Sequence, residues 1–97
     1  EVLYLDDNFI SDISSIKELK KLKEICISGN SIGNIDVMAG FDDLEYLNIS
    51  GNEVTDITVL GECDSLTGIN IWGNPLSDEQ IEEFFESNPH ISNLFGQ

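Results

Sequence analysis

Apolar residues return along this chain at a fixed 22-residue period. The phrase CISGNSIGNI at residues 26–35 is matched by NISGNEVTDI at residues 48–57, and the asparagine that both phrases share recurs without slippage. It occupies the four positions Asn8, Asn30, Asn52 and Asn74. A fixed period of this length indicates a repeat protein, in which each repeat forms one rung of a stack.

Each apolar position of one repeat is apolar in the other repeats as well. Two of these columns flank a polar position, and such alternation predicts a short parallel strand in every repeat, with one buried and one open face. The two columns hold Leu3, Ile25, Leu47 and Ile69, and Leu5, Ile27, Ile49 and Ile71. The further columns hold Ile10, Ile32, Val54 and Leu76; Ile13, Ile35 and Ile57; Ile16, Met38 and Leu60; and Leu19, Phe41, Cys63 and Phe85. Because a single rung buries little, the predicted core runs through the whole stack.

The recurring asparagine follows the predicted strand, at the point where the chain turns. Its side-chain amide offers donors and an acceptor to backbone groups of the turn, so we interpret it as structural rather than as a ligand. The residue before it is Gly29, Gly51 or Gly73, but Asp7 in the first repeat. Since Asp tolerates a left-handed backbone better than most residues, the pattern predicts a positive φ at this position.

The last repeat departs from the pattern, because two of its apolar columns hold glutamate. Ser77 and Gln80 have the spacing of a helix capping box, and an apolar stripe at helical spacing follows in Ile81, Phe84 and Phe85. We therefore expect a helix, and we interpret residues 77–97 as a divergent last repeat or a cap. Ile91 lies one full period after Ile69, which leaves open whether a fifth strand begins there.

Within one repeat the columns spell L-x-x-L-x-L-x-x-N, as in Leu44, Leu47, Ile49 and Asn52. This pattern resembles the leucine-rich repeat, and the tail of each copy is similar to the 22-residue class of bacterial internalins and of some intracellular regulatory proteins. The resemblance covers residues 2–76 and implies an α/β solenoid, with parallel β-strands on a concave face and short turns or helices on a convex face. We expect one leucine-rich repeat domain over residues 1–97, with about four repeats. Because residue 1 falls inside a repeat, we expect this domain to be a fragment of a longer array.

The charge of the chain excludes one class of partner. It holds 19 acidic residues against four lysines, with no arginine, so the formal net charge is −15. Nucleic-acid binding depends on phosphate neutralisation by basic side chains, and the only basic cluster is Lys17, Lys20, Lys21 and Lys23. The acidic surface favours either solubility alone or a basic partner. No apolar run is long enough to insert into a membrane.

The sequence offers little for catalysis, for cofactors or for metal ions. Adjacent acids such as Asp6 and Asp7 point to opposite faces of a strand, so we interpret them as solvated surface. His90 is the sole histidine, which leaves an ordinary metal site or a nucleophilic triad short of members. We therefore predict that the domain is not an enzyme and has no cofactor.

The two cysteines fall in different columns. Cys63 is in a core column, whereas Cys26 is on the open face of its strand, so we expect no disulfide between them and rapid labelling of Cys26 alone. Unpaired cysteines favour a reducing compartment. The resemblance to internalins instead implies a secreted or cell-surface protein, and of these two indications we favour the secreted or cell-surface location over the cytoplasm.

The open faces of the strands form the candidate binding surface, because the resemblance places them on the concave sheet. Its proposed partner-binding residues are Tyr4, Asp6, Glu24, Tyr46, Asn48, Asn70 and Trp72. Exposed Tyr and Trp on a rigid sheet are common anchors of protein interfaces, and we expect Gly68 to leave a gap for a partner side chain. The sequence thus predicts a protein-recognition module. The alternative is a spacer segment that supports another domain of the parent protein and binds nothing itself.

Overall fold

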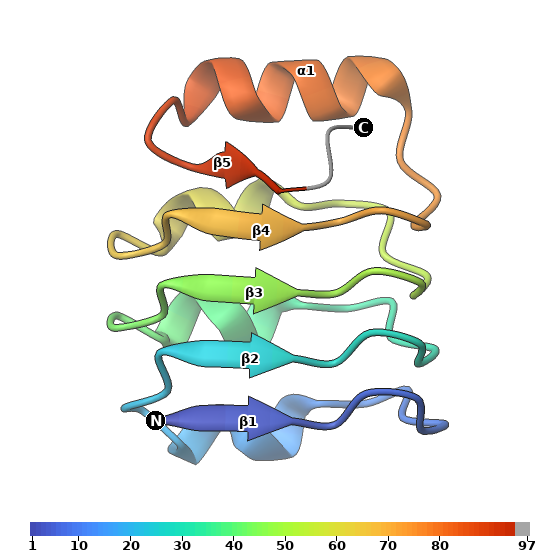
Figure 1. Cartoon of the computed structure of the whole chain (residues 1–97), viewed down its shortest axis with the longest axis vertical. Coiled ribbons are helices and arrows are strands. Elements are labelled where there is room, and N and C mark those ends of the chain that lie inside the picture. The colour runs from blue at the N-terminus through green and yellow to red at the C-terminus, as the bar shows by residue number, and fades with distance from the viewer. Residues whose placement is uncertain (95–97) are drawn as a thin grey trace.

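The repeats fold into rungs that stack in chain order, each adding one parallel strand to a single sheet (Figure 1). The computed structural model describes residues 1–94. Its strands are β1 (Val2–Tyr4), β2 (Glu24–Cys26), β3 (Tyr46–Asn48), β4 (Gly68–Asn70) and β5 (Ser92–Asn93). The fold is therefore the leucine-rich-repeat solenoid expected from the column pattern.

Strand register follows the repeat until the last rung. Val2 pairs with Glu24, and Glu24 pairs with Tyr46, so each partner lies one period further along the chain. Gly68 pairs with Ser92, which is two positions beyond one period. The last rung is longer because it contains a full helix, and its strand consequently begins at Ser92 rather than at Ile91. A fifth strand does form, which answers the question that the sequence left open.

The chain returns on the far side of the core through one short helix per rung. Three of these are 3₁₀ turns, η1 (Ser14–Glu18), η2 (Asp36–Gly40) and η3 (Thr58–Glu62), and each buries one apolar residue. A carboxylate or amide opens each turn: the Asp12 Oδ1 accepts the N–H of Ser14 at 2.9 Å, and Asn34 and Asp56 repeat this bond. The bond lowers the pKa of Asp12. The turn thus explains why Asp or Asn recurs at this position of each rung.

The fourth return segment is the helix α1 (Asp78–Ser87). The capping box is confirmed, since the Ser77 Oγ accepts the N–H of Gln80 while the Gln80 Oε1 accepts the N–H of Ser77. Gln80 also donates from Nε2 to the carbonyl of Thr55 at 2.7 Å, which ties α1 to the preceding rung. The prediction that Phe85 continues the core column was wrong. The α-helical twist buries Phe84 instead, and Phe85 packs edge-on against it with ring centroids 5.2 Å apart.

The core lies between the sheet and the helical layer, and it is continuous through rungs two to four. The predicted columns are buried there, including Cys63 at 1% exposure, except that Leu76 in the fourth rung is only partly buried. Leu19 is an exception, because 45% of its surface is exposed and the sequence had placed it in the core. The first rung has a neighbouring rung on one side only in this structure, so Leu3, Leu5 and Ile10 are also only partly buried.

The asparagine column forms a hydrogen-bonded ladder. The Asn30 Nδ2 donates to the carbonyls of Leu5 and Ile27, at 3.0 and 2.9 Å, and its Oδ1 accepts the N–H of Ile10 at 3.0 Å. Asn52 repeats these bonds one rung further on. Asn30, Asn52 and Asn74 therefore each satisfy backbone groups of their own rung and of the rung before it, which confirms the structural interpretation.

The residue before the ladder asparagine has the left-handed backbone that the sequence predicts. Its φ is 59° at Asp7 and 70°, 66° and 79° at Gly29, Gly51 and Gly73. These glycines also approach one another from rung to rung, since a Cβ at Gly73 would lie 3.2 Å from the nitrogen of Gly51. A side chain at this position meets both backbone strain and crowding.

Candidate binding surface on the concave face

The open face of the sheet, which we call the concave face, presents three residue positions from each of the first four rungs. The in-register pairing arranges them in rows across the strands, so that Val2, Glu24, Tyr46 and Gly68 form one row. A second row holds Tyr4, Cys26, Asn48 and Asn70. The third row, where the strands end, holds Asp6, Ser28, Ser50 and Trp72. None of these positions is basic.

Tyr4, Glu24, Cys26 and Tyr46 form a cluster at the β1–β3 end of this face. The Tyr4 hydroxyl donates to the Glu24 Oε2 at 3.2 Å, and the Cys26 Sγ lies 3.7 Å from the same oxygen. The hydrogen bond to Glu24 raises the pKa of Tyr4, with the charge of Glu24 adding to it. Loss of hydration raises the pKa of Tyr46, and the charges of Glu24 and Asp6 act in the same direction.

The expectation that Cys26 is open to solvent was wrong. Its side chain is on the predicted face, but it is only 7% exposed. The strands on either side place Tyr4 and Asn48 directly beside it. A small side chain between larger cross-strand neighbours loses most of its exposure to solvent. Burial, with the charges of Glu24 and Asp6 adding to it, raises the pKa of Cys26 to about 11. Both cysteines are free thiols, as expected.

Asp6 is held in place by the neighbouring rung. Its Oδ1 accepts the N–H of Ser28 at 2.7 Å and the Ser28 hydroxyl at 2.8 Å. Both donors are neutral, so the carboxylate is oriented without being neutralised. The structure therefore fixes the direction of a negative charge beside the cluster around Glu24.

Asn48 and Asn70 play the same local role in consecutive rungs. The Asn48 Oδ1 accepts the N–H of Ser50 at 3.1 Å, and the Asn70 Oδ1 accepts the N–H of Trp72 at 3.2 Å. Asn70 is only 6% exposed, so it offers a partner almost no surface although it lies on the predicted face. Its hydrogen bond instead orders the backbone at Trp72, whose side chain is 61% exposed.

The gap that the sequence predicted at Gly68 is filled by this chain itself. A Cβ at Gly68 would lie 3.0 Å from the Cδ1 of Leu94, and Gly68 is buried. Leu94 follows β5, and its N–H donates to the carbonyl of Ile69 at 2.9 Å. Because the fifth strand was uncertain from the sequence, this cover could not be foreseen. Leu94 itself remains 46% exposed and adds an apolar side chain to the concave face.

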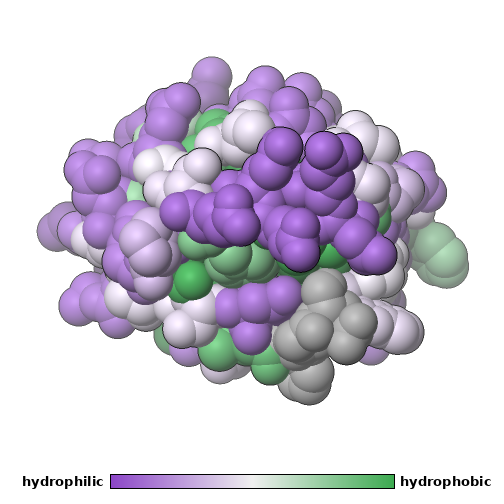
Figure 2. All heavy atoms as spheres, turned by 90° about the horizontal axis from the view of Figure 1, so that it is seen from above, coloured by the Kyte–Doolittle hydropathy of each residue, from purple (hydrophilic) through white to green (hydrophobic). Residues whose placement is uncertain are grey.

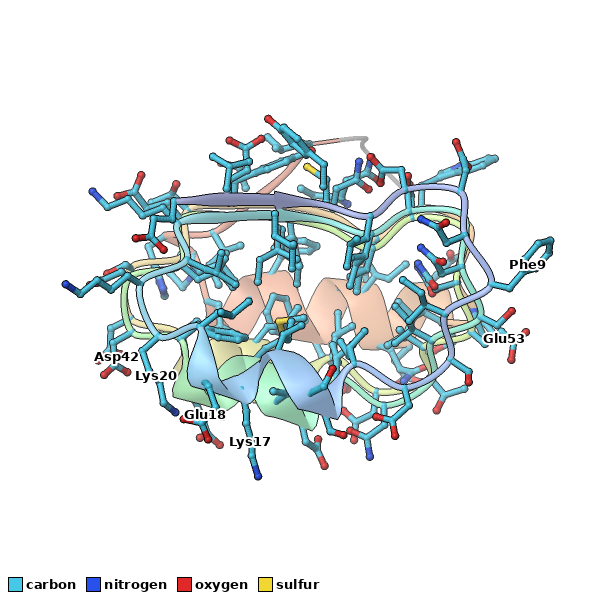
Figure 3. All side chains as sticks on the ribbon, turned by 90° about the horizontal axis from the view of Figure 1, so that it is seen from below. Phe9, Lys17, Glu18, Lys20, Asp42 and Glu53 are labelled. Atoms are coloured by element: carbon cyan, nitrogen blue, oxygen red, sulfur yellow. The ribbon has the colours of Figure 1, made fainter. Side chains whose placement is uncertain are left out.

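Phe9 is an exposed aromatic residue that sequence reasoning missed. It is 99% exposed, and it extends outward from the side of the stack where the asparagine turns lie (Figure 3). The position after the ladder asparagine holds Ser31, Glu53 and Pro75 in the other rungs. The sequence signal that could have identified it is an aromatic residue in a column that otherwise holds polar and turn residues.

Lys17 and Lys20 lie away from the concave face, with Lys17 pointing outward from the convex side (Figure 3). A hollow of about 730 Å³ between η1 and η2 is lined by both Lys17 and Lys20 and by Asp12 and Asp36. The repeat offset also places Asp42, Asp43 and Glu45 one rung after Lys20, Lys21 and Lys23. Acidic groups therefore interrupt the basic cluster, and it forms no continuous positive patch for a polyanion.

The α1 end of the stack is acidic, and hydrophilic residues form a broad band across it (Figure 2). A surface hollow of about 610 Å³ beside α1 is lined by both apolar and acidic residues. Its apolar members include Ile81, Phe85 and Ile91, and its acidic members are Glu82 and Glu86. Nothing in the structure indicates what covers it.

Two further properties bear on function. Within residues 1–94, no cluster of three or more His, Cys, Asp or Glu side chains is placed to hold a metal ion. Among the described helices, none has the length and apolar character needed to cross a membrane.

Comparison with known proteins agrees with the architecture. A family model described as "Leucine rich repeat" matches residues 1–54, which is more than half of the chain. No curated protein matches the chain significantly in sequence.

Several solved structures match the chain over most of its length. An internalin, InlF, of Listeria monocytogenes is 29% identical with a TM-score of 0.79, and the match covers 84% of this chain and 24% of that one. Internalin C2 of the same organism is 31% identical with a TM-score of 0.77, covering 80% of this chain and 34% of the other. A leucine-rich repeat protein of Leptospira interrogans is similar in fold, at 21% identity and a TM-score of 0.87, covering 98% and 25% respectively. The chain thus spans about a quarter to a third of these structures.

Proposed function

Because this chain belongs to the leucine-rich repeat family and is internalin-like, we propose that it recognises another protein through its concave face. Leucine-rich repeat domains are in general protein-interaction modules. The contact residues of this proposal are Tyr4, Asp6, Glu24, Tyr46, Asn48 and Trp72, with Asn70 acting beneath them. The role is binding, and no catalytic step is assigned to the chain.

The exposure of Tyr4 and Trp72 is the observation that carries the proposal. Their side chains are 64% and 61% exposed, and neither belongs to the apolar core. Large aromatic side chains bury much area on binding at low cost in side-chain entropy, which is why they dominate interface energetics. Tyr4 projects from the hydrogen-bonded sheet, and Trp72 projects from the turn after β4, where Asn70 and Gly51 hold its backbone, so little ordering is needed when a partner arrives.

The size of the surface sets how much of a partner this chain can hold. Five strands about 4.8 Å apart, with about five residues of about 3.3 Å each, give a face of a few hundred Å². A stable complex buries about 800 Å² on each side. Further rungs of a longer parent protein would supply the remainder.

Aromatic truncation tests the proposal. A partner is first isolated by affinity capture with the parent protein, and its affinity for purified variants is then measured by calorimetry. Trp72→Ala or Tyr46→Ala should weaken binding by about 2 kcal/mol, which is about 30-fold in Kd. Phe9→Ala is the matched control, since it removes an exposed aromatic residue outside the concave face. Parental affinity in both concave variants would reject concave recognition and favour either the spacer role or the acidic surface of α1 as the contact.

A further inference from the structure

The concave face has two chemically different ends. The acidic end, over β1–β3, carries Asp6 and Glu24 beside Tyr4 and Tyr46. The apolar end, over β4 and β5, carries Trp72 and Leu94, whose side chains are 61% and 46% exposed. The concave positions of both ends lack Lys and Arg, so the negative charge at the acidic end has no counter-ion on this face.

The acidic end is organised before any partner binds. Neutral donors orient its two carboxylates, because Ser28 donates twice to Asp6 and the Tyr4 hydroxyl donates to Glu24. Fixing these groups in advance removes most of the ordering cost that an exposed ion pair normally carries. Tyr4 and Tyr46 place ring surfaces beside the carboxylates, and a guanidinium or ammonium group is attracted to both kinds of group.

We infer that the partner presents to this face a cationic side chain, which docks on the acidic end, and an apolar side chain, which docks on the apolar end. The inference rests on the proposed function and specifies the chemistry of its partner. It also fixes a spacing. Three strand separations of about 4.8 Å lie between Glu24 on β2 and Leu94 beside β5, which gives about 14 Å. Four residues of extended chain, at about 3.3 Å each, cover about the same distance.

Small probes test the inference without the natural partner. N-acetyl-arginine amide is titrated into the isotope-labelled protein, and amide chemical shifts are followed by NMR. N-acetyl-citrulline amide, which has nearly the same shape without the charge, is the matched probe. The arginine probe should shift amides in β1, β2 and β3 near the acidic end, and the citrulline probe should do so much less. Shifts spread evenly over all acidic surfaces would overturn the inference.

A matched pair of variants separates the site from general attraction. Glu24→Gln keeps an oxygen that can accept from Tyr4 but removes the charge, and it should weaken the arginine probe by about fivefold. Glu45→Gln makes the same charge change at an exposed position off the concave face, and its effect should stay within about twofold. Equal effects of the two variants would overturn the inference.

The spacing is tested with two peptides. Acetyl-Arg-Gly-Gly-Gly-Leu-amide can reach both ends, whereas acetyl-Arg-Gly-Leu-amide spans only about 7 Å between its two side chains. The longer peptide should bind several-fold more tightly, because linking two contacts raises their effective concentration. Equal binding of both peptides would overturn the two-ended arrangement. Failure of these probes, with Trp72→Ala still reducing the affinity for the captured partner, would remove only this inference, whereas parental binding by Trp72→Ala would remove the proposed function.

Discussion

The side chain of Asn52 joins two rungs of the stack: its Nδ2 donates at 2.9 Å to the carbonyl of Ile27, which lies 25 residues earlier. The same nitrogen donates to the carbonyl of Ile49 in its own rung at 3.0 Å, and the Oδ1 accepts the N–H of Ile32 at 3.0 Å. A single amide thus completes the backbone hydrogen bonding of a turn on both sides. The residue is only 5% exposed, so water cannot replace it.

Replacement of this amide should therefore be costly. Asn52→Ala leaves several buried backbone groups without partners, and we expect it to lower the free energy of unfolding by about 3 kcal/mol. Asn8→Ala is the control, because Asn8 is exposed and bonds only within its own rung. It should cost less than about 1 kcal/mol. Urea melts give both values, and equal losses would contradict the ladder.

The left-handed position gives a second test through Gly51, whose φ is 66°. Gly51→Ala forces a side chain into a left-handed backbone and places its Cβ 3.4 Å from the nitrogen of Gly29, so it should destabilise by about 1 to 2 kcal/mol. Gly33→Ala is the comparison, because Gly33 is outside the left-handed region and a Cβ there would meet only the carbonyl oxygen of Glu53 at 3.6 Å. Thermal melts in which Gly33→Ala proved the more damaging would contradict this explanation.

Thiol labelling tests the burial of Cys26. Because Cys26 and Cys63 are both buried and the pKa of each is raised to about 11, both should react slowly with an aromatic disulfide reagent in the native state at about pH 8. Denaturant should release both to rapid reaction. Fast native labelling of Cys26 in a Cys63→Ser variant would show that the cover formed by its neighbours on the concave face opens readily.

The same raised pKa values predict a loss of stability in alkali. In the unfolded chain the thiols lose their protons near pH 9, whereas in the folded protein they keep them up to about pH 11. The folded state binds more protons in this window, so the free energy of unfolding should fall as pH rises from 9 to 11, by about 1 kcal/mol per pH unit for each cysteine. Below pH 9 this contribution is constant. Urea melts at several pH values across the window should show that the free energy of unfolding falls less steeply with pH in the Cys26→Ser, Cys63→Ser double variant. An unchanged pH dependence would mean that groups other than these two thiols cause the loss of stability.

The fold could be predicted from the sequence because every rung repeats the same physical requirements. Apolar columns, turn glycines and the ladder asparagine each recur with one period, so an error in one rung is corrected by the others. The last rung has no such redundancy. A helix replaces the 3₁₀ turn there, which changed the strand offset and left Phe85, expected in a core column, only partly buried beside the buried Phe84.

For the binding surface, the sequence predicted which face of the sheet each residue occupies, but not how exposed its side chain is. Alternation along a strand says which face a side chain occupies, but exposure depends on the size of its neighbours across the sheet. Cys26 and Asn70 lie on the predicted face and are nevertheless buried between the neighbouring strands. Leu94 covers Gly68 through a strand whose existence the sequence left open. Predicting the exposure of a single residue requires knowing how several rungs pack together in three dimensions.

The strands from β1 to β4 pair at a constant 22-residue offset, so the number of rungs can change without changing the structure of each rung. Excision of residues 31–52 would join Asn30 to Glu53 and return the chain to an equivalent point of the next rung, with the strand pairing and the asparagine ladder in phase. An excision longer or shorter by a single residue would instead turn one strand's apolar side chains to the wrong face of the sheet. Changes in the length of such a protein are therefore quantised. A gene encoding it can gain or lose reach in whole rungs while every remaining turn keeps its shape.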